Sequence, residues 1–187
     1  MNEGMLPIVQ ASDPVLRAQA EPVSKEQFGT PELDAMLDCM EQALDGQQDG
    51  VALAAPQIGI SLRIFIVRHD RLTVRTVNEP LPAPEVEIYI NPKVVRTSRK
   101  CEEVEEGCLS VRNVYGKTLR HADATVRAQR PDGSTFKRSG SGVLAQAFQH
   151  ETDHLEGILF IDHATDLVNI VPEVSTDGVP TTQHEVS

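Results

Sequence analysis

The sequence is poor in aromatic residues and in cysteine. It has no tryptophan, two tyrosines and five phenylalanines, and its three cysteines are Cys39, Cys101 and Cys108. So small and odd a number excludes a dense disulfide framework and favours a reducing compartment, with free or metal-bound thiols. A Cys101–Cys108 disulfide is the alternative, and it would need an oxidising location that nothing else in the sequence supports.

Basic residues are scarce as well. Lys and Arg total 17 against 28 Asp and Glu, which gives a net charge of −11. That balance argues against a broad surface for nucleic acid or for anionic membranes. The sequence also lacks an apolar run long enough to span a bilayer, and residues 1–10 lack the basic and apolar regions of a signal peptide. We therefore expect a cytoplasmic protein that binds neither DNA nor a membrane.

The length of 187 residues suits one domain with a full hydrophobic core. We expect that single domain over residues 1–163. Between 164 and 187 the periodicity fades, no Lys or Arg balances the acidic residues, and Pro172, Gly178 and Pro180 interrupt the segment. Such a composition is typical of a mobile acidic tail.

The spacing of apolar residues predicts two helices among short strands. One amphipathic helix covers residues 31–44, with Thr30 as its N-cap. A second follows the serine- and glycine-rich residues 139–142, where two serines could cap it, and ends near Gly157. Short strands or apolar runs are expected at 51–55, 62–67, 87–90, 94–97, 125–128, 134–137 and 158–161. The turn residues Pro131-Asp132-Gly133 predict a hairpin between 125–128 and 134–137. The pattern indicates an α+β fold, with short, mostly antiparallel strands wrapped around the second helix.

The most informative stretch is residues 150–154, HETDH. Residues four apart lie on the same face of a helix, so His150 and His154 can reach one metal ion. Glu151 is close enough to exchange protons with a water on that ion. Because Phe148 and Leu155 would bury one side of this helix, the two histidines would lie beside or within its apolar face.

A third ligand separates the enzyme classes that use this motif. A metzincin-like protease would need a histidine at position 160, which is Phe160. A thermolysin-like protease would use a glutamate about 20 residues beyond His154; Glu173 is the candidate, although no helical pattern surrounds it. Cys108 is the better choice, since a thiolate and two imidazoles give three ligands and leave one position open, as in catalytic sites.

Three segments together resemble the motifs of the peptide deformylase family. They are residues 50–59 (GVALAAPQIG), 106–110 (EGCLS) and 149–154 (QHETDH), in the order usual for that family. Each motif is short, but the three in order extend over most of the expected domain. The resemblance implies a metal-dependent hydrolase that removes the N-formyl group from formyl-methionyl peptides and releases formate.

The resemblance also implies roles for individual residues. Cys108, His150 and His154 would bind the metal, and Glu151 would be the general acid and base. The side chain of Gln57 and the backbone N–H of Leu109 would donate hydrogen bonds to the oxyanion. Alignment outward from the motifs places the following residues near the substrate: Val51, Ala52, Val104, Glu106, Gly107, Val143 and Ala147.

The metal and the partners follow from both lines of reasoning. Ligand softness allows Fe²⁺, Zn²⁺, Co²⁺ or Ni²⁺, and the spacing alone favours zinc. The resemblance implies Fe²⁺ in cells, with Zn²⁺, Ni²⁺ or Co²⁺ possible in purified protein. The implied partners are N-formylmethionyl peptides of nascent chains and, transiently, the ribosome, although the acidic tail lacks the basic C-terminal helix of some bacterial members. We expect a monomer.

Two residues depart from the family pattern. Ala52 stands where the first motif usually has glycine, and its methyl group could narrow the site. Arg112 stands where proline often follows the cysteine motif. Two alternatives therefore stay open beside an active deformylase: a related protein with altered specificity or with a binding role only, and a zincin-type endopeptidase.

Overall fold

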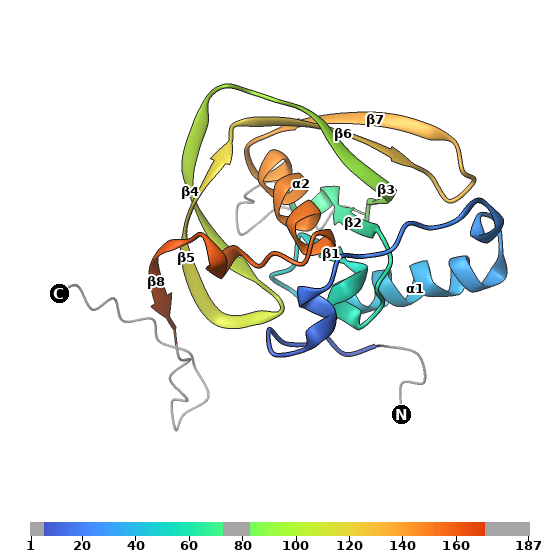
Figure 1. The fold of residues 1–187 in the computed structure, drawn as a ribbon, viewed down its shortest axis with the longest axis horizontal. Helices are drawn as coiled ribbons and strands as arrows, with labels where there is room; N and C mark the ends of the chain where they lie inside the picture. Colours follow the sequence, from blue (N-terminus) through green and yellow to red (C-terminus); the bar gives the residue numbers. More distant parts are fainter. Residues whose placement is uncertain (1–5, 73–82, 171–187) are drawn as a thin grey trace.

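The computed structural model describes residues 6–72 and 83–170. Within them two α-helices and eight β-strands form one α+β unit, in which α2 (Gly142–Leu155) lies at the centre and strands of two sheets surround it (Figure 1). The predicted fold class is confirmed. None of the helices in these residues is long and apolar enough to cross a membrane.

Helix α1 (Pro31–Asp45) forms where the sequence predicts it. The Thr30 hydroxyl accepts a hydrogen bond from the backbone N–H of Leu33, and proline occupies the first turn, where its missing N–H costs nothing. The buried stripe consists of Leu33, Leu37, Met40, Ala43 and Leu44. It packs on β1 (Ala52–Ala54) and on the short 3-10 helix Ala55–Ile58, and so supports the segment of the first motif.

The larger sheet is antiparallel throughout, in the order β1-β2-β3-β6-β7. Its other strands are β2 (Ile64–Arg68), β3 (Val86–Thr97), β6 (Asp123–Gln129) and β7 (Thr135–Ser141). The hairpin predicted around Pro131-Asp132-Gly133 joins β6 to β7. Gly133 there has φ of 81°, which only glycine adopts readily.

One prediction about this sheet is wrong. The two strands expected at 87–90 and 94–97 are one strand, β3, which continues through Asn91-Pro92. Asn91 takes φ of 49° at a register shift opposite β6, and its side chain bonds both the N–H and the carbonyl of Val23. These bonds compensate the local break in pairing, so the strand bends without ending.

The smaller sheet was not predicted. It contains β4 (Cys101–Cys108), β5 (Val111–His121) and β8 (Thr165–Asn169), all antiparallel. The structure therefore differs from the predicted tail at its start, because β8 pairs with β5, with Tyr115 opposite Val168. Residues 171–187, which contain Glu173, lie outside the described residues.

Helix α2 buries its apolar side against the larger sheet. Phe148 packs on Phe65 and Tyr89, with ring centroids 6.2 and 5.3 Å away. The start differs from the prediction, because residues 139–141 belong to β7 and the Ser141 side chain makes no capping bond. Gly157, at φ of 76°, follows the helix as expected. The apolar run at 158–161 contains no strand; the 3-10 helix Phe160–Asp162 forms there.

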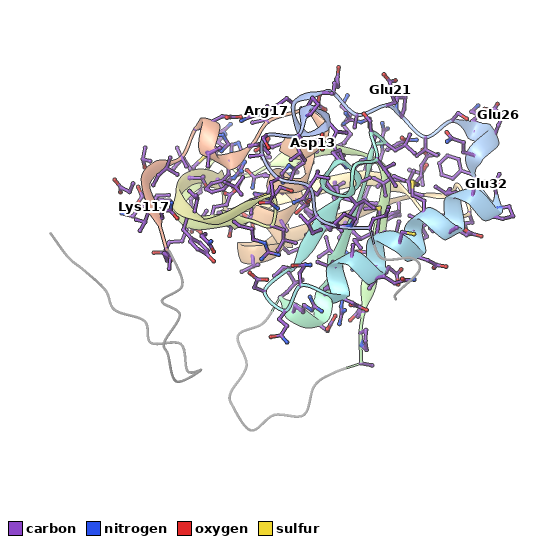
Figure 2. The ribbon with its side chains drawn as sticks, turned by 90° about the horizontal axis from the view of Figure 1, so that it is seen from below. Asp13, Arg17, Glu21, Glu26, Glu32 and Lys117 are labelled. Carbon is purple, nitrogen blue, oxygen red and sulfur yellow. The ribbon has the colours of Figure 1, made fainter. Side chains whose placement is uncertain are left out.

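The N-terminal segment ties these parts together. It runs along one side of the molecule, where Figure 2 labels Asp13, Arg17 and Glu21. The Ala20 N–H donates to the Leu155 carbonyl at 2.9 Å, and Arg17 pairs with Asp162 beyond the end of α2. The Val9 N–H donates to the Gln57 carbonyl at 2.9 Å, which fixes the 3-10 helix against the same segment.

Candidate active site

Cys108, His150 and His154 come together although three strands, β5 to β7, separate Cys108 from the helix α2 that carries both histidines. Cys108 ends β4, and the two histidines occupy successive turns of α2, with ring centroids 4.8 Å apart. One ligand atom from each residue lies within 4.8 Å of the others. The Cys108 sulfur is 3.2 Å from Nε2 of His154. Neither Cys101 nor Cys108 takes part in a disulfide, so the Cys101–Cys108 bridge is excluded.

A buried carboxylate orients His150. Glu106, two residues before Cys108 on the same side of β4, accepts a hydrogen bond from Nδ1 of His150. Its oxygens also accept from Arg120, at 2.7 and 3.0 Å, and from the Thr118 hydroxyl. Arg120 reaches Asp153 of α2 as well, at 2.6 Å. Because Nδ1 of His150 is engaged, Nε2 is the nitrogen left to face a metal.

The charges in this network set the protonation of its members. Burial raises the pKa of Glu106, but hydrogen bonds from His150 and Arg120 outweigh it and hold that pKa well below its ordinary range. Burial lowers the pKa of His150, but hydrogen bonds to Cys108 and Glu106 raise it well above its usual value. The groups around His150 thus favour a positive charge close to the three ligand atoms, and a site that binds a cation needs such an environment.

Glu151 and His154 have buried polar atoms without a partner among the described residues. These atoms are Oε2 of Glu151 and Nδ1 of His154, and the two residues are only 3 % and 1 % exposed. Burial raises the pKa of Glu151 to about 7, and burial followed by the charge of His150 lowers the pKa of His154 well below its ordinary value. An unpaired carboxylate oxygen is costly to bury unless a ligand or water meets it. The residues present therefore fit a divalent metal and an attendant water.

Gln57 also points into the site. Its side-chain oxygen, Oε1, accepts from the Ala54 N–H at 2.8 Å. This contact aims Nε2 at Cys108 Sγ, 3.5 Å away, and at Ser110 Oγ, 3.3 Å away. Ser110 is completely buried, and its own N–H lies 3.4 Å from Cys108 Sγ. Nε2 of Gln57 and the backbone N–H of Ser110 thus both lie beside the thiol.

A cavity of about 250 Å³ opens onto these groups. Six of the seven residues predicted near substrate line it: Val51, Ala52, Glu106, Gly107, Val143 and Ala147. Val104 does not. It precedes Glu106 by two positions in β4, which moves it roughly 7 Å along the strand. Glu106 lines the wall, but its two oxygens are taken by Arg120, Thr118 and His150.

The sequence reasoning missed several residues of this site. Arg120 and Thr118 carry no local signal, because only the register of β4 and β5 brings them to Glu106. Asp49 and Tyr115 also line the cavity. Tyr115 lies opposite Gly107, where an added Cβ would be 2.8 Å from its ring. A glycine inside a strand often marks such a close approach, and that signal could have located the ring.

The arrangement has the parts needed to hydrolyse an amide. Three soft or borderline ligand atoms meet beside an unpaired carboxylate whose pKa is near neutrality. The side-chain amide of Gln57 is a hydrogen-bond donor beside Cys108, and apolar side chains line part of the cavity. Such a site can bind a divalent ion, move protons and stabilise an oxyanion.

Known proteins are similar to this chain in both sequence and fold. The polypeptide deformylase family matches residues 5–169. The peptide deformylase of Acidobacterium capsulatum is 43 % identical over 156 residues, covering 83 % of this chain and 84 % of its own. That of Halothermothrix orenii is 42 % identical over 159 residues, covering 84 % and 92 %.

Solved structures agree with these relatives. The Met-Ala-Ser-bound class I type b peptide deformylase from Acinetobacter baumannii superposes with a TM-score of 0.75 at 31 % identity, covering 85 % of this chain and 98 % of that one. The peptide deformylase from Thermotoga maritima gives a TM-score of 0.72 at 33 % identity, covering 86 % and 98 %.

Proposed function

This chain belongs to the peptide deformylase family, and from that membership we propose that Cys108, His150 and His154 hold its catalytic metal while Glu151 transfers protons. The enzyme hydrolyses the N-terminal formyl group of formyl-methionyl polypeptides and releases formate. The observation that carries the assignment of residues is the meeting of the three ligand atoms within 4.8 Å, beside the unpartnered Oε2 of Glu151.

The family's metal dependence agrees with the donor set. A thiolate with two imidazoles suits Fe²⁺, Zn²⁺, Co²⁺ or Ni²⁺, and we propose Fe²⁺ in cells, with the other three as substitutes in purified protein. When bound, the ion supplies a water of lowered pKa and a positive charge beside the carbonyl oxygen. Glu106 would hold the His150 ring at the angle and tautomer that ligation needs.

Proton transfer falls to Glu151. Its pKa of about 7 allows the carboxylate to accept the proton of the attacking water and to return it near neutral pH. The returned proton goes to the amine nitrogen as the C–N bond breaks, because an unprotonated amine is a poor leaving group. Formate and a free N-terminal methionine are the products.

The oxyanion would be stabilised from the protein side. Nε2 of Gln57 and the N–H of Leu109 are the proposed donors, and contacts with Ala54 and Ser110 hold the Gln57 side chain in place before substrate arrives. One such donor is commonly worth roughly 2.7–4 kcal/mol of the barrier. The methionine side chain would occupy the apolar part of the cavity, against Val51, Val143 and Ala147, with Ala52 and Gly107 along the substrate backbone.

The relative from Acinetobacter, solved with Met-Ala-Ser, supports a peptide with N-terminal methionine as the ligand. We infer that nascent chains in the cytoplasm are the source of this substrate, that ribosome contact is transient and that the enzyme is monomeric. The endopeptidase alternative is not favoured, because the chain matches the deformylase family.

Formate release tests the proposed reaction. Protein purified without oxygen and loaded with Fe²⁺ or Ni²⁺ is given formyl-Met-Ala-Ser, acetyl-Met-Ala-Ser and a longer unformylated peptide. We expect formate from the first, no deacylation of the second and no internal cleavage of the third. Absence of formate at one bound metal per chain would overturn the proposal in favour of a binding role, and internal cleavage would favour the endopeptidase.

A further inference from the structure

The rim of the cavity carries a pair of opposite charges. Asp49, from the turn between α1 and β1, lines the cavity, and its side chain is 64 % exposed. Arg112, at the start of β5, places Nη1 3.7 Å from the Asp49 carboxylate. Its other terminal nitrogen donates to the side-chain oxygen of Gln47 in the same turn. Arg112 therefore bridges from the cysteine motif to the turn across the rim.

Asp49 is the acidic group of the cavity wall that an incoming side chain can meet. The other two carboxylates of that wall, Glu106 and Glu151, are 4 % and 3 % exposed. Glu106 is also neutralised by Arg120. Among the residues that the structure describes, Arg112 is the cation within 4 Å of Asp49. Arg112 is thus the residue that balances the charge of Asp49.

Arg112 is not needed to fold the turn. Arg71 holds the same turn from inside, where Nη1 donates to the carbonyls of Leu44, Gln47 and Gly50 at 3.3, 2.7 and 2.7 Å. Gly50 lies against Leu44 and Leu109, with no room for a side chain. Since these contacts fix the backbone, a change at Arg112 alters charge more than shape.

We propose that Asp49 and Arg112 form a charge-balancing pair that sets the preference of the enzyme between acidic and basic side chains downstream of the substrate methionine. The inference rests on the proposed function, since it needs the cavity to hold a peptide. With both charges present, the rim is close to neutral and neither class is favoured. Loss of Arg112 leaves a carboxylate that attracts basic residues and repels acidic ones, and loss of the Asp49 charge does the reverse.

The test measures selectivity rather than activity. Formyl-Met peptides with Lys or Glu as the second or third residue, amidated at the C-terminus, are compared by kcat/KM. We expect Arg112→Ala to raise the Lys-to-Glu ratio by about two- to fivefold and Asp49→Asn to lower it by a similar factor, the range for exposed charge pairs. The double variant should return near the wild-type ratio, and 0.5 M salt should weaken each shift.

Two further variants keep the test decisive. Arg112→Gln keeps a donor for Gln47 without the charge, and it replaces Arg112→Ala if the latter does not fold. Lys100→Ala removes the same charge just before β4, at the opposite end of that strand from Cys108. Lys100 pairs there with Glu102, and its loss should leave the ratio unchanged. The proposal that the two residues act as a pair would be overturned if active Arg112 and Asp49 variants kept the wild-type Lys-to-Glu ratio. A shift of the ratio in only one of them would overturn it as well. Wild-type protein that deformylates none of the peptides would instead overturn the proposed function.

Discussion

The carboxylate of Glu106 in β4 accepts a hydrogen bond from Nδ1 of His150 in α2, across 44 positions of sequence. This contact joins the smaller sheet to the central helix at the point where Cys108 also leaves β4. It fixes which nitrogen of His150 faces the other ligand atoms. A strand that the sequence pattern did not predict thereby orients a histidine of the proposed metal site.

Glu106→Gln should weaken metal binding by about 10- to 100-fold, the usual cost of losing the partner of a ligating histidine. An amide accepts the His150 bond less strongly, and it leaves Arg120 without its buried counter-ion. Competition with a chelator of known affinity measures the change. Glu103→Gln is the matched control, because Glu103 is an exposed residue of β4 paired with Lys117. Equal affinities for the wild type and Glu106→Gln would refute the orienting role.

Ser110 should act on catalysis through Gln57. Its hydroxyl is the contact that holds Nε2 of Gln57 beside the thiol. We expect Gln57→Ala to lower kcat by about 10²- to 10³-fold and Ser110→Ala by about fivefold, with KM nearly unchanged. In a double-mutant cycle, Ser110→Ala should cost almost nothing once Gln57 is alanine. Additive losses would mean that Ser110 acts elsewhere, for example through its N–H to Cys108.

Asp70 should make stability depend on pH at acid values. Hydrogen bonds from Arg68, two at 2.8 Å, and from the Glu85 N–H hold its pKa well below the ordinary range. Because the folded pKa is the lower one, the stabilisation is present above about pH 4 and is lost as the pH falls toward the folded value. Asp70→Asn should therefore reduce the free energy of unfolding by about 1 kcal/mol at pH 7, and by less at pH 3. Urea denaturation of both proteins at each pH measures the difference, and a constant difference would contradict this assignment.

The periodicity of apolar residues was enough to predict the two helices, because each helix buries only one of its sides. The stripe from Leu33 to Leu44 gave α1, and Phe148 with Leu155 gave the buried side of α2. The turn at Asp132-Gly133 gave the hairpin, since few residues other than glycine adopt a positive φ. The motifs singled out Cys108, His150 and His154, whose potential ligand atoms lie within 4.8 Å of one another, because the spacing of these motifs reflects chemistry rather than packing.

The smaller sheet could not be predicted in the same way. The outward residues of β4 include Glu103 and Glu105, and its inward residues include Glu106 and Cys108, so neither face reads as apolar. The inward face is polar because its residues belong to the candidate site. Glu106 accepts a hydrogen bond from Arg120, and the pairing of β4 with β5 brings Arg120 within reach. The pairing of Asp49 with Arg112 was missed for a similar reason. The two side chains are 3.7 Å apart, but they belong to separate segments of the sequence that only the fold brings together.

Replacement of Glu151 by glutamine separates metal binding from proton transfer. Glutamine keeps the shape of this buried side chain but cannot accept a proton, and Glu156→Gln, at the exposed end of α2, is the matched control. Metal content and formate release are measured on the same samples. We predict one metal per chain in all three proteins and a loss of at least about 10²-fold in turnover for Glu151→Gln alone. Turnover within tenfold of the wild type at full metal content would contradict the role of Glu151.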